Sequence, residues 1–191
     1  MEQPRPRVRL QQTCAARPEV VYDVLSDLRT HLEWGGAKQS SVFRLKALTA
    51  PSGPATVGTA FSSSGTIPMS GRHWEDRSTV TVAIRPSVFE FATEARARDA
   101  RREMAAQYVH RYEIAPDGAG SRVTYTLTEE RVADPMLRFA IPGMREMSWR
   151  MAAFMLARGF RNLLTLAAAR SAAEGKRDAV AGVRTQYRKE A

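Results

Sequence analysis

Cysteine, histidine and long hydrophobic runs are scarce in this sequence of 191 residues. Cys14 is the only cysteine, which excludes an internal disulfide and a thiolate cluster for zinc or iron–sulfur. The most apolar stretch, residues 151–169, is interrupted by Arg158 and Arg161 and therefore does not read as a membrane span. The N-terminus has no apolar segment of the kind that a secretory signal contains. We therefore expect a cytoplasmic protein.

Metal-binding and nucleophile motifs are also missing. The three histidines are His31, His73 and His110, and no two of them have the i, i+4 or His-x-His spacing of a preformed metal site. The sequence contains neither a GxSxG elbow nor a glycine-rich phosphate loop. Cys14, on an expected strand, is interpreted as small buried filler. The sequence thus predicts no metal, no cofactor and no cysteine nucleophile.

Positive charge is in excess, with a formal net charge of +9, but it is only partly concentrated. Arginines gather in the first nine residues, and basic side chains gather again in residues 176–191. No basic stripe with interleaved aromatic residues appears, which argues against specific nucleic-acid binding. A weak contact between the basic C-terminal tail and an acidic membrane surface stays open as an alternative.

The sequence does contain the pattern of a single α+β domain. Residues 8–14 alternate as a half-buried strand does, and residues 20–28 and 30–34 have helical spacing. Residues 40–131 predict six antiparallel strands separated by turn signals. A long helix over residues 144–173 carries an apolar stripe suited to covering a sheet. We therefore predict an N-terminal tail over residues 1–6, one domain over 7–174 and a basic, unstructured tail over 175–191.

Methionines mark the far side of the expected long helix, away from its stripe. They are Met144, Met147, Met151 and Met155. In one interpretation, the apolar residues before Pro142 cover them. In the other, they form a pocket rim, a membrane-touching surface or a contact between two copies, so a homodimer also stays open.

Several segments resemble one known superfamily in order and spacing. They are VVYDVLSDLRTHLEW (20–34), VGTAF (57–61), IRPSVFEF (84–91), HRYEIAPDGAGSRVTYTLTEE (110–130) and RGFRNLLTLAAARSAAE (158–174). Together they resemble the START-like (SRPBCC) superfamily, in its polyketide cyclase/dehydrase and lipid-transport branch. The resemblance implies a helix-grip fold, in which a curved seven-stranded antiparallel sheet, two short helices and a long C-terminal helix enclose a cavity for apolar molecules.

The most informative polar side chains lie on the expected hairpin of the last two strands. With a turn at Asp117-Gly118, pairing brings Tyr112 near Tyr125, His110 near Leu127, and Tyr108 near Glu129. His110, Glu129 and Tyr108 are therefore the candidates for acid–base chemistry. The same groups also suit orientation of a ligand, or simple satisfaction of one another inside the fold.

The function that these patterns favour is binding or carriage of a small hydrophobic or amphipathic metabolite, lipid or polyketide-like. The expected ligand-binding residues are Phe61, Trp74, Val82, Phe89, Phe91, Tyr108, His110, Tyr112, Tyr125, Phe154 and Leu156. One alternative is a cofactor-free polyketide aromatase/cyclase or dehydratase that uses general acid–base catalysis. Another is a module that interacts with a membrane or a protein. The nature of the ligand stays open.

Overall fold

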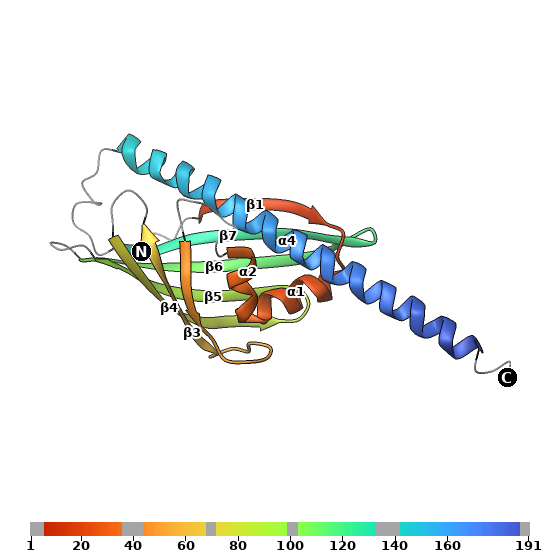
Figure 1. Ribbon diagram of the computed structural model, residues 1–191. Helices are drawn as coiled ribbons and strands as arrows, with labels where there is room; N and C mark the ends of the chain where they lie inside the picture. The colour runs from red at the N-terminus through yellow and green to blue at the C-terminus, as the bar shows by residue number, and fades with distance from the viewer. Residues whose placement is uncertain (1–5, 36–43, 68–71, 99–102, 133–141, 188–191) are drawn as a thin grey trace.

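A seven-stranded antiparallel sheet forms one layer of the computed structural model, with strand order β1-β7-β6-β5-β4-β3-β2 (Figure 1). The structure describes residues 6–35, 44–67, 72–98, 103–132 and 142–187. The strands are β1 Pro6–Cys14, β2 Arg44–Thr49, β3 Ala60–Ile67, β4 Arg72–Ile84, β5 Val88–Arg98, β6 Glu103–Asp117 and β7 Gly120–Val132. This is the helix-grip α+β fold that the sequence predicts.

Helices cover one face of the sheet, which we call the inner face. They are α1 Pro18–Ser26, the short 3-10 helix η1 Leu28–Thr30, α2 His31–Gly35 and the long α4 Pro142–Tyr187. Helix α4 packs against β1, α1 and α2, and it runs diagonally across the sheet (Figure 1). The buried apolar side chains therefore lie between this helical layer and the inner face.

Helix α1 forms because Pro18 suits a first helical turn and the apolar residues after it recur at helical spacing. Thr30 then ties α1 to α2: its Oγ1 donates a hydrogen bond to the Val24 carbonyl at 2.7 Å and accepts one from Trp34 Nε1 at 3.1 Å. Asn162 of α4 donates to the carbonyl of Trp34 at 3.2 Å. These bonds hold α2 in one position between the sheet and α4.

The hairpin of β6 and β7 has the register that the sequence predicts. Gly118 lies in the turn with a positive φ of 59°, a conformation that glycine adopts without steric cost. Tyr112 consequently lies opposite Tyr125, and Tyr108 lies opposite Glu129. The turn at Asp117-Gly118 is therefore confirmed.

Val82, which the sequence predicts as a ligand-binding residue, does not lie on the inner face, so this expectation is wrong. The register with β5 shifts between Val80 and Val82, so Val82 lies opposite Glu90, while Ala83 lies opposite the buried Phe89. A β-bulge adds one residue and moves the following side chains to the other face. Val82 therefore does not share the inner face with Val80, and Ile84 is 57% exposed.

The prediction of an unstructured tail over residues 175–191 is also wrong for most of this segment. Helix α4 continues through Gly175 to Tyr187 and projects beyond the sheet (Figure 1). Residues 172–177 are exposed, so the side chains of this described segment are not packed against the sheet. The alanine, arginine and lysine residues after Ala173 have high helix propensity, which favours a helix here without support from packing.

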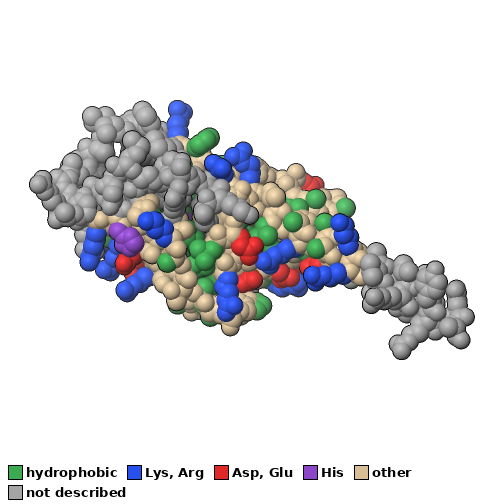
Figure 2. All heavy atoms as spheres, viewed as in Figure 1, with side chains coloured by type: hydrophobic (Ala, Val, Ile, Leu, Met, Phe, Trp, Pro, Cys, Tyr) green, Lys and Arg blue, Asp and Glu red, His purple; other side chains and the backbone are tan. Residues whose placement is uncertain are grey.

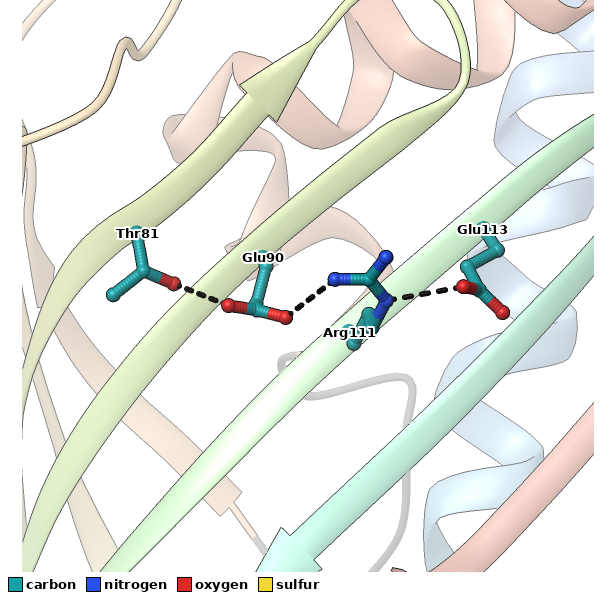
Figure 3. Close-up of polar contacts among 4 residues, drawn as sticks. All are labelled: Thr81, Glu90, Arg111 and Glu113. Carbon is teal, nitrogen blue, oxygen red and sulfur yellow. Dashed lines mark hydrogen bonds and ion pairs between the residues drawn. The ribbon is translucent and has the colours of Figure 1, made fainter.

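The outer face of the sheet carries polar side chains in contact across the strands. Figure 3 shows a chain of contacts in which Thr81 donates to Glu90 at 2.8 Å and Arg111 bridges Glu90 and Glu113 at 2.8 and 3.1 Å. In Figure 2, basic and acidic side chains are intermingled over the visible surface. The excess of positive charge thus forms no single basic face in this view.

Candidate functional site

Three rows of side chains cross the inner face of β5, β6 and β7. The rows are Phe89 with Tyr112 and Tyr125, Phe91 with His110 and Leu127, and Thr93 with Tyr108 and Glu129. Strand pleating alone places these residues on one face, because alternate side chains of a strand point the same way. The inner face therefore combines aromatic rings with a few polar groups.

The end of this face nearest α1 is closely packed. Tyr112 and Tyr125 lie 4.8 Å apart between ring centroids, and Phe160 of α4 lies 6.1 Å from Tyr125. Phe89 has no accessible surface, and Tyr112 and Tyr125 retain 5% and 2%. These three predicted ligand-binding residues thus belong to the packed core and support the more accessible groups beside them.

His110 is held within this aromatic cluster. Its ring stacks on Phe91 at 4.6 Å, and its Nδ1 lies 2.9 Å from the hydroxyl of Tyr125. Burial, with a smaller effect of His31, lowers the pKa of His110 to about 3. His110 is therefore neutral at pH 7, and its hydrogen-bonding partner is Tyr125 rather than Glu129.

His31 is a second neutral histidine, which the sequence analysis did not place in the site. Helix α2 brings its ring 4.2 Å from Trp34, 5.8 Å from Phe61 and 5.9 Å from Phe91. Burial lowers its pKa to about 4, an effect that the Leu28 carbonyl partly offsets. Its Nδ1 is buried and forms no hydrogen bond with any residue that the structure describes. No local pattern could have found this residue, because its neighbours come from distant strands.

The other end of the inner face is more polar. Glu129 lies opposite Tyr108 and forms an ion pair with Arg7 of β1 at 3.0 Å. The guanidinium of Arg7 lies 5.9 Å from the ring of Trp149, which meets Tyr108 edge to face at 6.2 Å. Burial, and then the charges of Glu129 and Asp76, raise the pKa of Tyr108 to about 12. Tyr108 is therefore a neutral hydrogen-bonding group here.

Asp76 is a further polar residue at this end, and it was not among the predicted site residues. It lies on β4 opposite Ser63 and Ala95, and alternation places it on the inner face with Trp74, Ser78 and Val80. Burial raises its pKa to about 7. Among the described residues, no hydrogen bond or ion pair to its carboxylate is formed. Because alternate residues of a strand share a face, the buried Val80 already indicates that Asp76, four residues earlier, also points inward.

The predicted wall residues on α4 and β4 differ in exposure. Phe154 is 77% exposed, so the expectation that it lines the interior is wrong. It follows Ala153, which packs against the core, by one residue, and one residue turns an α-helix by about 100°. Leu156, in contrast, is partly buried against the core, and Trp74 is half-buried on the inner face.

The methionine side chains at 144, 147 and 151 lie outside the described residues, as do the apolar residues before Pro142, whereas Met155 is half-buried.

Within the part of the chain that the structure describes, no group of three or more His, Cys, Asp or Glu side chains is placed to hold a metal ion. The helices searched there include none with the length and apolarity needed to cross a membrane.

Three recesses defined by described residues are lined largely from the outer face. Their volumes are about 290, 200 and 270 Å³. Charged side chains such as Arg77, Glu94 and Arg96 line them, and Asp76 contributes to the recess of about 270 Å³, whereas the predicted aromatic residues line none of the three. These recesses therefore do not correspond to the expected ligand site.

A curved antiparallel sheet that holds a long C-terminal helix over aromatic and polar side chains defines a helix-grip protein. The chain belongs to the polyketide cyclase/dehydrase and lipid transport family, whose model matches residues 5–174. No protein of curated function matches the sequence.

Solved structures show the same fold at low sequence identity. A protein of Chromobacterium violaceum is 17% identical, with a TM-score of 0.57 over 84% of this chain and 96% of that one. A protein of Thermus thermophilus is 16% identical, with a TM-score of 0.57 over 86% and 98%. A Mycobacterium smegmatis protein is 16% identical, with a TM-score of 0.53 over 87% and 90%.

Proposed function

We propose that this protein binds a small hydrophobic or amphipathic molecule in a hollow between the inner face of the sheet and helices α2 and α4. His31, backed by the buried rings of Phe61 and Phe91, would form its apolar end. Tyr108, Trp74 and the polar groups near Glu129 would form the other end. Apolar walls provide most of the affinity for such a ligand, and a few polar groups fix its orientation.

One observation carries this proposal. His31, Asp76, Tyr108 and His110 are desolvated enough to shift their pKa values, yet each keeps part of its surface accessible to water. A side chain in solid packing loses both its hydration and its accessible surface. A side chain in bulk solvent keeps both. Groups that combine desolvation with accessibility are those expected to border an internal hollow.

The properties of His110 and Glu129, two of the candidates for acid–base chemistry, favour ligand binding over catalysis. A catalytic base works best with a pKa near the working pH, and the pKa of His110 is lowered to about 3. Glu129 is engaged in an ion pair with Arg7. We therefore propose these side chains as orienting groups for a ligand.

The test is a fluorescence titration with N-phenyl-1-naphthylamine, a neutral apolar dye that brightens in apolar surroundings. Ala106→Leu adds bulk to the inner face of β6 between Tyr108 and the strand end. Ala105→Leu adds the same bulk to the outer face of the same strand and is the matched control. We expect saturable binding to the wild type, a loss of at least tenfold in affinity in Ala106→Leu and little change in Ala105→Leu.

Two outcomes would contradict the proposal. One is an absence of saturable dye binding to a correctly folded wild type, judged by circular dichroism and by a cooperative melt. The other is an equal loss of affinity in both leucine variants. Native mass spectrometry of the purified protein would add the identity of any molecule that remains bound.

A further inference from the structure

Asp76 occupies an unusual position for a carboxylate. It faces inward from the middle of β4, opposite Ser63 on one side and Ala95 on the other. Its inward neighbour Ser78 is already bonded to Thr93, with the two hydroxyl oxygens 2.9 Å apart. This hydroxyl pair is thus satisfied without Asp76, whose direct cross-strand neighbours are Ser63 and Ala95.

The charges around Asp76 leave negative charge in excess. From β7, Glu129 is balanced by Arg7 of β1. From β6 the facing titratable group is Tyr108, and from α2 it is His31, both neutral at pH 7. Among the described residues, no cation is paired with Asp76. Although the chain carries a net charge of +9, the described side chains in this part of the interior include two carboxylates, those of Asp76 and Glu129, and one guanidinium, that of Arg7.

Aromatic rings accompany the carboxylate. Trp74 precedes Asp76 by two positions on the same strand and points to the same face, which places the two Cα atoms about 7 Å apart. Tyr108, across β5, lies near enough for the charge of Asp76 to help raise its pKa, and it packs edge to face with Trp149. A carboxylate that shares a face with indole and phenol rings is a combination that attracts an organic cation.

We propose that Asp76 binds the protonated amine of an amphipathic ligand, with Trp74 and Tyr108 flanking the cation. The inference rests on the proposed function, since the apolar part of the ligand would occupy the hollow. A neutral ligand would instead accept a hydrogen bond from the protonated carboxyl. The excess of acidic side chains over basic ones favours the cation.

The protonation state of Asp76 supports the proposal and makes it measurable. With a pKa raised to about 7 by burial, the carboxyl of the free protein is about three-quarters protonated at pH 6.5. Pairing with a cation stabilises the ionised form, so binding of an ammonium ligand expels the proton. An aliphatic amine is fully protonated at this pH and contributes no proton change of its own.

The first experiment compares two probes of the same skeleton, 4-phenylbutylamine and 4-phenylbutan-1-ol, as competitors of N-phenyl-1-naphthylamine at pH 8. We expect the amine to bind wild type about tenfold more tightly than the alcohol. Asp76→Asn should abolish this preference and leave the alcohol affinity within about twofold. Glu75→Gln is the matched control, since it removes a neighbouring exposed carboxylate on the outer face.

The second experiment needs no variant, so it stays decisive if Asp76→Asn fails to fold. Calorimetric titrations of wild type at pH 6.5, in two buffers of different ionisation enthalpy, give the number of protons exchanged. We expect the amine to release more than half a proton and the alcohol to release none. Equal affinities for the two probes, or amine binding without proton release, would overturn the inference.

The outcomes separate this inference from the proposed function. Dye binding without a preference for the amine leaves the proposed function standing and overturns the role of Asp76. An amine preference that persists in Asp76→Asn likewise overturns it. An absence of dye binding overturns both, because the inference depends on the hollow.

Discussion

Polar side chains on the two faces of the same strands differ in their burial and in their partners. On the outer face, Glu90, Arg111 and Glu113 satisfy one another at the surface (Figure 3). On the inner face, His110 and Tyr108 are desolvated, and Asp76 has no partner among the described residues. Since strand alternation alone separates these environments, residues that are adjacent in the sequence can have different roles.

The largest expected effect contrasts two phenylalanines of α4. Phe160→Ala should lower the free energy of unfolding by about 3–5 kcal/mol, because Phe160 is buried against Tyr125 and its removal leaves a cavity. Phe154→Ala, six residues earlier and 77% exposed, should change it by less than about 0.5 kcal/mol. Urea denaturation of both variants is the measurement. Equal losses would show that α4 does not present one face to the sheet.

The next contrast is between Asp76 and its neighbour Glu75. The pKa of Asp76 is raised from 3.8 to about 7 in the folded protein, so the stability from its protonation is fully present below pH 3.8. That stability is lost as the pH rises through about 7. Asp76→Asn avoids the loss and should stabilise the protein at pH 8 by about 1–3 kcal/mol.

The measurement is the free energy of unfolding at pH 8 and at pH 4.5. The gain of Asp76→Asn over the wild type should shrink at pH 4.5. At this pH the Asp76 carboxyl of the folded wild type is protonated and is therefore as neutral as the amide that replaces it. Glu75→Gln should show no such dependence, because Glu75 is exposed on the outer face. A gain for Asp76→Asn that is the same at both pH values would disprove the buried position of this carboxylate.

A smaller effect is expected for the bond between His110 and Tyr125. Each single substitution, His110→Phe or Tyr125→Phe, leaves one buried polar group without its partner at 2.9 Å. The double variant removes both groups, so the two losses should not add. A thermodynamic cycle at pH 7 should give a coupling of about 1 kcal/mol. Additive losses would mean that the hydrogen bond contributes nothing to stability.

Local patterns predicted most of the fold. The β6–β7 register follows from a turn that Gly118 fixes, so the cross-strand pairs from Asp117 back to Tyr108 could be counted from it, and the register shifts beyond Tyr108. The bulge after Val80 has no such signal, and it reversed the assignment of Val82. Apolar character alone led to the wrong placement of Phe154, whose helical angle already separates it from the stripe.

The candidate site was less predictable because it is assembled over long distances. His31 contacts Phe61 and Phe91 only because α2 packs against the sheet. Arg7 and Glu129 are far apart in the sequence and meet because β1 pairs with β7. Asp76 is different, since alternation from the buried Val80 would have placed it inward. A charged residue at an inward position of a strand is thus a signal worth weighing, even where apolar residues dominate.

The smallest expected effect is on the outer face. Arg111→Met keeps most of the apolar stem and removes the charge that bridges Glu90 and Glu113. Exposed ion pairs contribute little, so the loss should stay below about 1 kcal/mol and shrink further between about 0.05 and 0.5 M NaCl, as screening weakens the wild-type contacts. Urea denaturation at the two salt concentrations measures both quantities. A larger, salt-independent loss would place Arg111 among the buried groups and remove the distinction between the two faces.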